Sequence, residues 1–216
     1  MSTYLQLTNR VLRKMRETEV VSITDNLYSV LVGDFVNEAR DVVQRAWAWT
    51  CLRSTLTVSA TVGDYQYSLT GAGTDFQIHD AINDTQNARM RQWTPVEFNS
   101  RFLLNSPASG APTDYCYRGL DANGDMQIDV YPIPDGSYTL KFDMTIREGD
   151  LEVAADTTNL PIYPVTSLAY ALAARERGET GGTAAQELFQ LASIALGDAI
   201  ALDAQHYPQD LTWREV

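Results

Sequence analysis

The sequence has few of the residues on which cross-links and bound cofactors depend. Its 216 residues include two cysteines, Cys51 and Cys116, and two histidines. Two cysteines without CxxC spacing are too few for a disulfide framework, which favours a reducing compartment such as the cytoplasm. A chain of this length can bury roughly 70% of its unfolded surface, so it can hold a core without a metal or a disulfide.

Long hydrophobic runs are also missing. No apolar stretch approaches the roughly 18 residues that are needed to span a bilayer, and the N-terminus lacks the apolar core of a signal peptide. We therefore expect a protein that is soluble at synthesis and has no membrane partner.

Positive charge is scarce. The chain has 16 basic and 28 acidic residues, with a formal net charge of −12. Proteins that hold DNA usually supply about 6–10 phosphate contacts from Lys or Arg, so this chain is not a general nucleic-acid binder. An acidic surface is either ordinary solubilising charge or a surface past which DNA moves without sticking.

The sequence carries no catalytic fingerprint. His79 and His206 lie about 127 residues apart, without Cys, His or carboxylate neighbours at ligand spacing, and no serine lies in a GxSxG motif. The stretch GETGGT from Gly178 to Thr183 lacks the lysine of a phosphate-binding loop and follows a helix, so it is interpreted as a helix C-cap and turn. We predict a protein that is not an enzyme and has no cofactor.

Helical periodicity appears at both ends of the chain. Apolar residues recur at helical spacing from Thr3 to Arg16 and from about Leu27 to Leu52. The second segment contains Trp47 and Trp49 and has charges such as Glu38, Arg40 and Asp41 between its apolar positions. Helices are also expected at 161–177 and 183–204. Thr94, Pro95 and Glu97 predict the start of a short helix from Pro95 to Phe102.

Alternating residues between these helices predict β structure. Strands are expected from Thr55 to Val62, around Tyr65 to Leu69, at 76–78, 89–93, 115–118, 126–131 and 138–146, the last three forming an antiparallel meander. The predicted fold is α+β: a bundle of N-terminal (1–54) and C-terminal (151–204) helices, an inserted antiparallel β domain (55–150) and a C-terminal tail (205–216).

The stretch DANGDMQIDVYPIPDGSYTL begins with Asp121, Asn123 and Asp125 at alternate positions, like a calcium loop. Such a loop needs glycine at position 6 and a bidentate carboxylate at position 12, where this chain has Met126 and Pro132. A hairpin with a type I′ turn at Asn123-Gly124 is the favoured interpretation. The acid pairs Asp121/Asp125 and Asp114/Asp135 are interpreted as solvated turn carboxylates, and we predict no metal site.

The order of these segments carries a family resemblance. The stretches TVSATVGDYQYSLT, RQWTPVEFNSRF, YCYRGLDANGDMQIDVYPIPDGSYTLKFDMTIREGDL and LPIYPVTSLAYALA follow one another along most of the chain. In these segments the chain resembles the head-to-tail adaptor proteins of short-tailed bacteriophages, which are also called connector or head completion proteins. The adaptors that it resembles are of the tail tubular protein A-like kind. Each segment is degenerate, and none is a catalytic fingerprint.

The resemblance implies a virion structural protein that assembles in the host cytoplasm. Such an adaptor forms a homo-oligomeric ring of twelve copies beneath the portal protein, extends the DNA channel without binding DNA specifically, and attaches the tail (nozzle or tube) proteins. Closed rings arise from heterologous contacts, and a permanent contact buries about 2,000 Å² or more. The helices are expected to carry these contacts, with the β region projecting outward or toward the tail.

Two alternatives remain open. One is that the chain is another neck or tail-tube ring protein, and the other is that its four tryptophans and eleven tyrosines make the β region a glycan-binding module. Trp47 and Trp49 fall in a predicted helix, and most tyrosines fall in predicted strands. These positions favour packing in the core and in interfaces over glycan binding.

The last residues of the chain are predicted to be a portal-docking arm. Pro208 discourages continuation of the preceding helix, and the segment from Gln205 presents Tyr207, Leu211 and Trp213 among polar residues. Tyr and Trp are enriched at binding hot spots, so these three side chains are the expected docking residues. The alternative is that they fold back on the chain's own helices.

Overall fold

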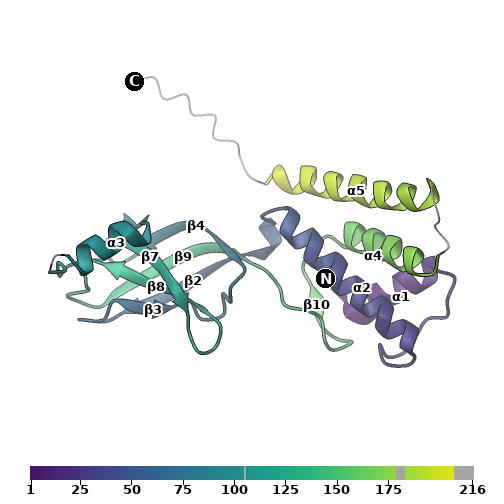
Figure 1. Cartoon of the computed structure of the whole chain (residues 1–216), viewed down its shortest axis with the longest axis horizontal. Coiled ribbons are helices and arrows are strands. Elements are labelled where there is room, and N and C mark those ends of the chain that lie inside the picture. Colours follow the sequence, from purple (N-terminus) through teal and green to yellow (C-terminus); the bar gives the residue numbers. More distant parts are fainter. Residues whose placement is uncertain (105, 179–182, 207–216) are drawn as a thin grey trace, which may run out of the picture. The chain divides into compact units, whose positions relative to one another are not determined.

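The chain folds into two compact units. A computed structural model describes residues 1–104, 106–178 and 183–206 (Figure 1). The helical unit comprises Met1–Leu52 and Glu148–Val216, and the β unit is the single segment Arg53–Arg147. The fold is α+β, as predicted. Within the described ranges, no helix combines the length and apolar character needed to cross a membrane.

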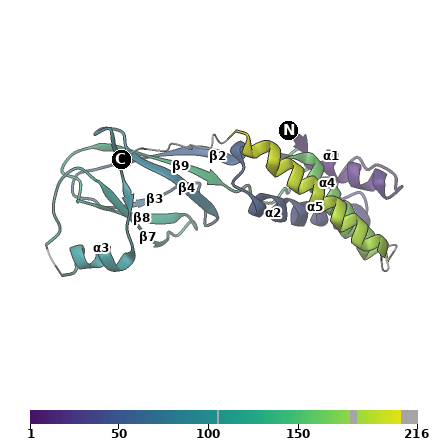
Figure 2. The same cartoon turned by 90° about the horizontal axis from the view of Figure 1, so that it is seen from above.

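Four helices pack together in the described part of the helical unit. They are α1 (Tyr4–Lys14), α2 (Leu27–Ala46), α4 (Ile162–Glu176) and α5 (Thr183–Ala204). Helix α4 contacts α1, α2 and α5, and α1 also contacts α2. Figure 2 shows α5 running alongside α4. The strands β1 (Ser2–Thr3) and β10 (Thr157–Thr158) pair in a small antiparallel sheet beside α1.

The first two helices begin at reciprocal side-chain caps. Thr3 Oγ1 accepts the N–H of Gln6 at 3.2 Å, and Gln6 Oε1 accepts the N–H of Thr3 at 3.1 Å. Asn26 and Ser29 form the same arrangement at the start of α2. Each of these reciprocal pairs is a capping box. It gives hydrogen-bond partners to two amide groups that the start of a helix leaves without them, which explains why the helices begin at these residues.

Helix α2 is shorter than its periodicity predicts. It ends at Ala46, and Trp47 is extended with φ −153° and ψ 153°. The Trp49 indole is fully buried and donates to the carbonyl oxygen of Val43 at 2.8 Å, so the chain folds back over the last turn of the helix. The prediction that Trp47 and Trp49 lie in the helix is therefore wrong. A 3-10 turn, η1 (Thr50–Leu52), leads into the β unit.

Aliphatic residues dominate the core of the helical unit. Residues from α1, α2 and α4 meet there, joined by buried side chains of the connecting segments. Tyr4 of α1 packs against Gly33 of α2, where an added Cβ would lie 2.4 Å from the tyrosine oxygen. Fully or almost fully buried members of this core include Leu7, Val11, Leu12, Val32, Val36, Ala39, Val43, Trp49, Val165, Ala169 and Ala173.

The β unit contains two four-stranded sheets, which face each other (Figure 2). One has the order β2–β9–β4–β5 and the other the order β3–β8–β7–β6. The strands are β2 (Arg53–Ala60), β3 (Gln66–Ser68), β4 (Phe76–Asn83), β5 (Ala88–Arg89), β6 (Arg91–Gln92), β7 (Asp114–Leu120), β8 (Met126–Tyr131) and β9 (Tyr138–Ile146). Leu140, Phe142 and Met144 of β9 share one buried cluster with Ile128 and Val130 of β8.

The predicted three-stranded meander does not form. Strands β7 and β8 pair as an antiparallel hairpin, but β9 lies in the other sheet between β2 and β4. The segment after β8 does not reverse tightly. Instead, Ile133 donates to the carbonyl oxygen of Ala108 and accepts from the N–H of Gly110, each at 2.9 Å. These bonds direct the chain away from β8, so β9 pairs along its length with β2.

Two other strand predictions need correction. Strand β4 extends to Asn83, five residues beyond the predicted end, with a register shift between Ile78 and Asp80. The predicted strand at 89–93 is two short strands separated by Met90. Its N–H donates to the carbonyl oxygen of Ala81 at 2.7 Å and its side chain is buried. Strand β5 pairs with β4, whereas β6 pairs in parallel with β7 in the other sheet.

Helix α3 (Pro95–Phe102) forms where the sequence predicts it. Thr94 is the N-cap, Pro95 occupies the first turn, and the Glu97 carboxylate accepts a hydrogen bond from the N–H of Thr94. The Phe98 and Phe102 rings stack with centroids 4.5 Å apart. Pro95, Phe98 and Phe102 line one side of a hollow whose other walls include residues of β7 and β8, so α3 lies over the face of that sheet opposite the core.

The turn between β7 and β8 is a hairpin turn, as predicted, but not of type I′. Gly124 has φ +86°, whereas Asn123 does not have the positive φ that a type I′ turn requires. Gly124 donates to the carbonyl oxygen of Asp121, and Asp121 donates to the carbonyl oxygen of Asp125. This is the three-residue hairpin loop in which one glycine takes the left-handed conformation.

Candidate functional site

The aspartates of the calcium-like stretch bind backbone amides of the chain itself. Asp121 Oδ1 accepts the N–H groups of Asn123 and Asp125, at 2.8 and 3.0 Å. Asp125 Oδ1 accepts the N–H groups of Gly71 and Gly73, at 3.1 and 2.9 Å. The bond from the Asp125 amide is the main cause that lowers the pKa of Asp121. Among the described residues, no group of three or more His, Cys, Asp or Glu side chains could hold a metal ion.

The second predicted pair of acids does not form a pair of turn carboxylates. Asp114 is buried at the start of β7, where it accepts from the hydroxyl of Thr113 at 2.7 Å. Its predicted place in a solvated turn is therefore wrong, because β7 begins one residue earlier than the pattern indicates. Asp135 lies in the turn before β9 and accepts from the Tyr138 hydroxyl at 2.5 Å.

Histidine and cysteine occupy structural positions. The His79 Nε2 lies 2.7 Å from the hydroxyl of Thr145, at the irregularity in β4. Burial is the main cause that raises the pKa of both thiols, to about 11 for Cys51. A thiol with a raised pKa is a poor nucleophile, because the reactive form is the thiolate. Neither cysteine has the environment of an activated catalytic residue.

The glycine-rich stretch after α4 begins as the predicted helix cap. Gly178 has φ +68°, and its N–H donates to the carbonyl oxygen of Arg175 at 3.1 Å. Residues 179–182 of this stretch lie outside the described ranges.

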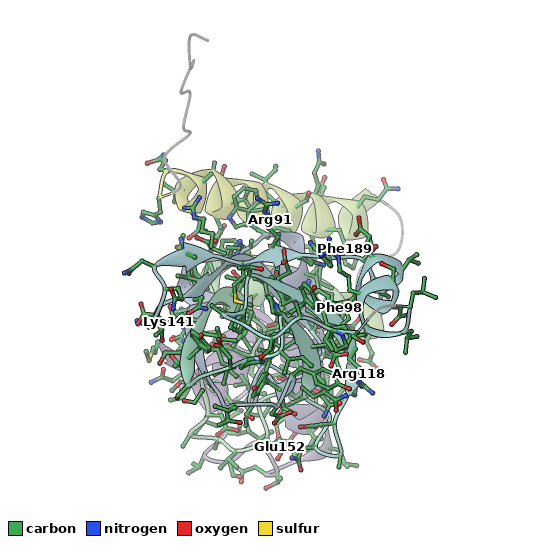
Figure 3. All side chains as sticks on the ribbon, turned by 90° about the vertical axis from the view of Figure 1, so that its left-hand side faces the viewer. Arg91, Phe98, Arg118, Lys141, Glu152 and Phe189 are labelled. Atoms are coloured by element: carbon green, nitrogen blue, oxygen red, sulfur yellow. The ribbon has the colours of Figure 1, made fainter. Side chains whose placement is uncertain are left out.

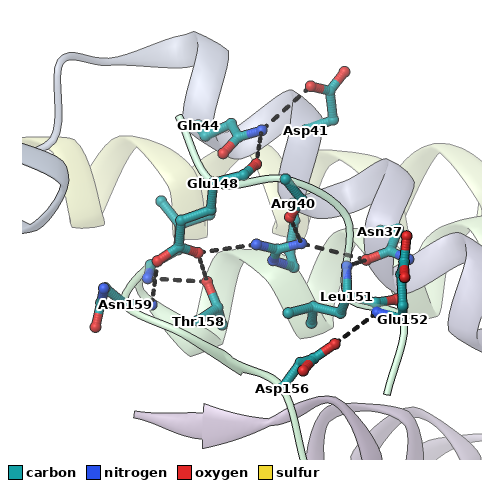
Figure 4. Close-up of polar contacts among 12 residues, drawn as sticks. Asn37, Arg40, Asp41, Gln44, Glu148, Leu151, Glu152, Asp156, Thr158 and Asn159 are labelled. Atoms are coloured by element: carbon teal, nitrogen blue, oxygen red, sulfur yellow. Dashed lines mark hydrogen bonds and ion pairs between the residues drawn. The ribbon is translucent and has the colours of Figure 1, made fainter. Parts of the chain in front are cut away.

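A buried arginine lies where the chain returns from the β unit. Arg40 of α2 is 1% exposed, and its guanidinium binds Glu148, the first residue of the returning segment, at 2.9 Å (Figure 4). It also donates to the carbonyl oxygen of Gly149 at 3.2 Å and to Asn37 Oδ1 at 3.3 Å. A buried guanidinium needs such partners, because an unpaired charge in the interior is costly.

Glu148 and Asn37 extend this contact over the returning segment. The Glu148 carboxylate accepts from the Thr158 hydroxyl at 2.6 Å and from the Asn159 N–H at 2.9 Å (Figure 4). Asn37 exchanges two hydrogen bonds with the backbone of Leu151, each 3.0 Å long. The Arg40 network therefore fixes residues 148–159 against α2.

A second anchor lies at the end of the first segment, just before the β unit. Asp203 of α5 accepts from the Thr50 hydroxyl at 2.5 Å, the Thr50 N–H at 3.0 Å and the Trp47 indole at 3.0 Å. Burial alone raises the pKa of Asp203, but the hydrogen bonds from Thr50 and Trp47 outweigh it and hold the pKa below its usual range. The Asp203 anchor and the Arg40 network together secure the two segments that enter and leave the β unit.

An ion pair of the β unit lies beside a hollow lined by aromatic residues. Asp129 is 9% exposed and binds Arg118 at 3.0 Å, in the wall of a hollow of about 370 Å³ beneath α3. Burial raises the pKa of Asp129, and Arg118 opposes this shift only in part. Figure 3 shows Arg118 at the periphery of the unit. Asp129 is buried on this face of the sheet because α3 lies over it.

The aromatic side chains near α3 are packed against one another. Trp93 stacks on Tyr131 with ring centroids 5.8 Å apart, and the Arg101 guanidinium lies 4.7 Å from the Trp93 centroid. Arg101 also lies 5.4 Å from the Tyr131 centroid. These contacts cover faces of the Trp93 and Tyr131 rings that a bound sugar would need for stacking.

The predicted docking residues Tyr207, Leu211 and Trp213 lie outside the described residues. Of the tail, the structure describes Gln205 and His206, whose Nδ1 lies 3.6 Å from Asp203. The anchor residues themselves were not predicted. Arg40 follows Val36 by four residues and precedes Val43 by three, a spacing that puts it on the buried face of α2. Glu148 and Asp203 carry no such local signal, because their partners lie 108 and 153 residues away.

Comparison with known protein families finds a match over nearly the whole chain. No curated protein matches the sequence. The model of the SU10 adaptor protein family matches residues 2–214, nearly the whole chain, and covers both the helical and the β unit. The chain therefore belongs to the SU10 adaptor protein family, and it is a structural protein of the phage head-tail adaptor class.

Proposed function

We propose that the chain forms a ring under the portal protein of a short-tailed phage, extends the DNA channel and provides the attachment site for the tail. The observation that carries this proposal is the family match over residues 2–214. A ring of twelve copies follows from matching the portal's symmetry, with the helices making the contacts between copies. Closed rings need heterologous contacts, for which the helical unit has suitable surfaces.

The negative charge of the chain supports the role in the channel. With a net charge of −12, the ring repels the phosphate backbone and offers few of the cationic contacts that retain DNA. DNA then passes without specific binding. This part of the proposal predicts no retarded band when the chain is mixed with duplex DNA at physiological salt.

Electron cryomicroscopy of the chain mixed with its portal tests the ring directly. We expect ring-shaped density on the axis at one end of the portal, and tail proteins that bind the portal only when the chain is present. If the chain instead assembles only with tail proteins and leaves the portal bare, it is a neck or tail-tube ring protein.

We also propose that the C-terminal segment docks on the portal through Tyr207, Leu211 and Trp213. The segment has aromatic anchors and too few apolar residues for a core of its own. Deleting residues 205–216 should leave the melting temperature nearly unchanged and abolish portal binding. A deletion that unfolds the chain and spares docking would contradict the proposal, and a Tyr207→Phe variant serves as the conservative control.

A further inference from the structure

Helix α2 presents a continuous stripe to solvent that is both apolar and acidic. Leu27, Val30 and Val42 are 91%, 36% and 48% exposed, and Asp34 and Glu38 are exposed between them. Their spacing of three and four residues places all five on one side of the helix. Neither Asp34 nor Glu38 has a salt-bridge partner among the described residues. We call these five residues the acidic stripe.

A groove of opposite character lies on α1, α4 and α5. Two adjoining hollows, of about 500 and 300 Å³, share Lys14 of α1 and Tyr163 of α4 in their walls. Arg10 and Arg13 line the larger hollow, and Leu191 of α5 lines the smaller one. Tyr163 is 67% exposed and Leu191 is 58% exposed. We call these five residues the basic groove.

Positive charge is concentrated at this groove. Four of the chain's 16 Lys and Arg residues lie between positions 10 and 16. Arg13 binds Glu19 at the surface, whereas Arg10 has no salt-bridge partner in the described ranges. The Lys14 ammonium lies 5.5 Å from the ring centroid of Tyr170. In a chain with a net charge of −12, this local positive charge favours contact with an acidic surface.

The two surfaces face away from their shared core. Val32, Val36 and Val43 of α2 are buried in that core, on the opposite side of the helix from the acidic stripe. Leu7 and Val11 of α1 are buried in it as well, whereas Arg10 and Arg13 are exposed. A single copy therefore cannot place its own stripe in its own groove, but a neighbouring copy can.

We propose that the acidic stripe of one copy binds the basic groove of the next. The occupant of the groove is thus a second copy of this chain, with Asp34 and Glu38 opposite Arg10 and Arg13, and Leu27, Val30 and Val42 against Tyr163 and Leu191. Two different surfaces that complement each other make a head-to-tail contact, which closes into a ring when the rotation between copies allows it. This inference rests on the proposed ring and specifies the contact that builds it.

Charge reversal on each surface tests the contact. The first full-length variant carries Arg10→Glu and Arg13→Glu, the second carries Asp34→Lys and Glu38→Lys, and the third carries all four changes. Because these side chains are exposed, each variant should keep the far-UV circular dichroism and melting temperature of the wild type within a few degrees. The measurement is the number of copies on the cognate portal by native mass spectrometry.

The first and second variants alone should lose the complete ring, with at least a tenfold drop in occupancy. Mixed in equal amounts, they should recover it as an alternating ring, because the reversed groove of the first variant complements the reversed stripe of the second, and the native stripe of the first still complements the native groove of the second. The third variant should form a ring by itself but not with wild-type copies. Arg91→Glu in the β unit and Glu152→Lys in the segment after it change exposed residues that belong to neither surface, so they serve as controls and should assemble normally.

The outcomes separate this inference from the proposed function. If the first and second variants each form complete rings like the wild type, the contact is elsewhere and the inference is wrong, while the adaptor function stands. If mixing and the fourfold reversal both fail to restore rings of folded protein, the pairing of these surfaces is wrong. If the wild-type chain binds no portal, the proposed function fails, and the interface that rests on it fails as well.

Discussion

The two units of this chain use charge in different ways. The helical unit buries an arginine that is 1% exposed against a glutamate that is 19% exposed. In the β unit, the basic partner in every described ion pair is more than a quarter exposed, from Arg147 at 29% to Arg89 at 82%. The β unit is one continuous segment with an aromatic core, whereas the helical unit is assembled from two segments far apart in sequence.

This difference shows where a discontinuous unit needs specific contacts. Apolar packing alone tolerates shifts of one segment against another, because it is not directional. The Arg40 network and the Asp203 anchor are directional, and they act on Glu148 and Thr50, which stand beside the two boundaries of the β unit. The β unit needs no equivalent, because its strands are held in register by backbone ladders.

The largest effect is expected from removing the buried guanidinium. Arg40→Ala leaves the largely buried Glu148 carboxylate without its ion partner and should lower the free energy of unfolding by about 3–5 kcal/mol. Urea unfolding measures this loss. Arg45→Ala on the same helix is the matched control, since its pair with Asp41 is exposed and should contribute no more than about 0.5 kcal/mol. Equal losses in both variants would remove the distinction between the two units.

A core truncation in the β unit should have the next largest effect. Leu140 is fully buried in β9, the strand between β2 and β4, and Leu140→Ala should cost about 3 kcal/mol. Because the two units have separate cores, hydrogen exchange should increase in Arg53–Arg147 and stay nearly unchanged in α1 and α2. Uniform loss of protection along the whole chain would show that the units do not unfold separately.

Acid should act on the two units in opposite directions. The folded pKa of Asp203 is depressed, so its contribution to stability is complete above its unfolded pKa of about 4 and is lost as pH falls through the folded pKa. Asp203→Asn should therefore cost about 1–3 kcal/mol at pH 7, and less as the pH falls below 4. Unfolding midpoints of both proteins between pH 7 and pH 3 measure this convergence, and a constant difference would contradict it.

The Asp129 carboxyl provides the opposite case. Its folded pKa is raised by burial, so the folded state binds this proton more tightly than the unfolded state does. Protonation of Asp129 thus favours the β unit as the pH falls from neutral toward 4. Asp129→Asn should reduce the pH dependence of protection in β7 and β8 over that range, as measured by hydrogen exchange corrected for intrinsic rates.

The smallest effect is expected from calcium. Both aspartates at the turn before β8 already accept backbone N–H groups, and Met126 and Pro132 replace the turn glycine and the bidentate ligand of a calcium loop. Titration calorimetry should detect no calcium binding at Asp121 to Asp129. Micromolar affinity that is lost in Asp121→Ala would contradict this prediction.

Local signals in the sequence were sufficient for most elements of the fold. The cap formed by Thr94, Pro95 and Glu97 was confirmed, and the periodic pattern at 183–204 agrees with the bounds of α5. What failed depends on contacts between distant residues. Trp49 leaves the helical pattern because its indole is buried in the core, and β9 leaves the meander because β2, more than 80 residues earlier, is its partner.

The functional surfaces were less accessible to sequence reasoning. The sequence favoured a role for the helices in the ring, but the acidic stripe and basic groove depend on which charged side chains the packing leaves exposed. Arg40 and Arg10 both lie in helices, yet Arg40 is buried against Glu148 and Arg10 is exposed beside Lys14. The predicted docking residues Tyr207, Leu211 and Trp213 remain a prediction.

The central claim is that copies of this chain assemble into a ring on the portal through the helical unit. Native mass spectrometry of the full chain, alone and mixed with its portal, tests it most directly. The account predicts one portal assembly carrying twelve copies, and loss of that species when Arg10 and Arg13 are both changed to Glu. A chain that stays monomeric beside its portal at every concentration tested would contradict the account.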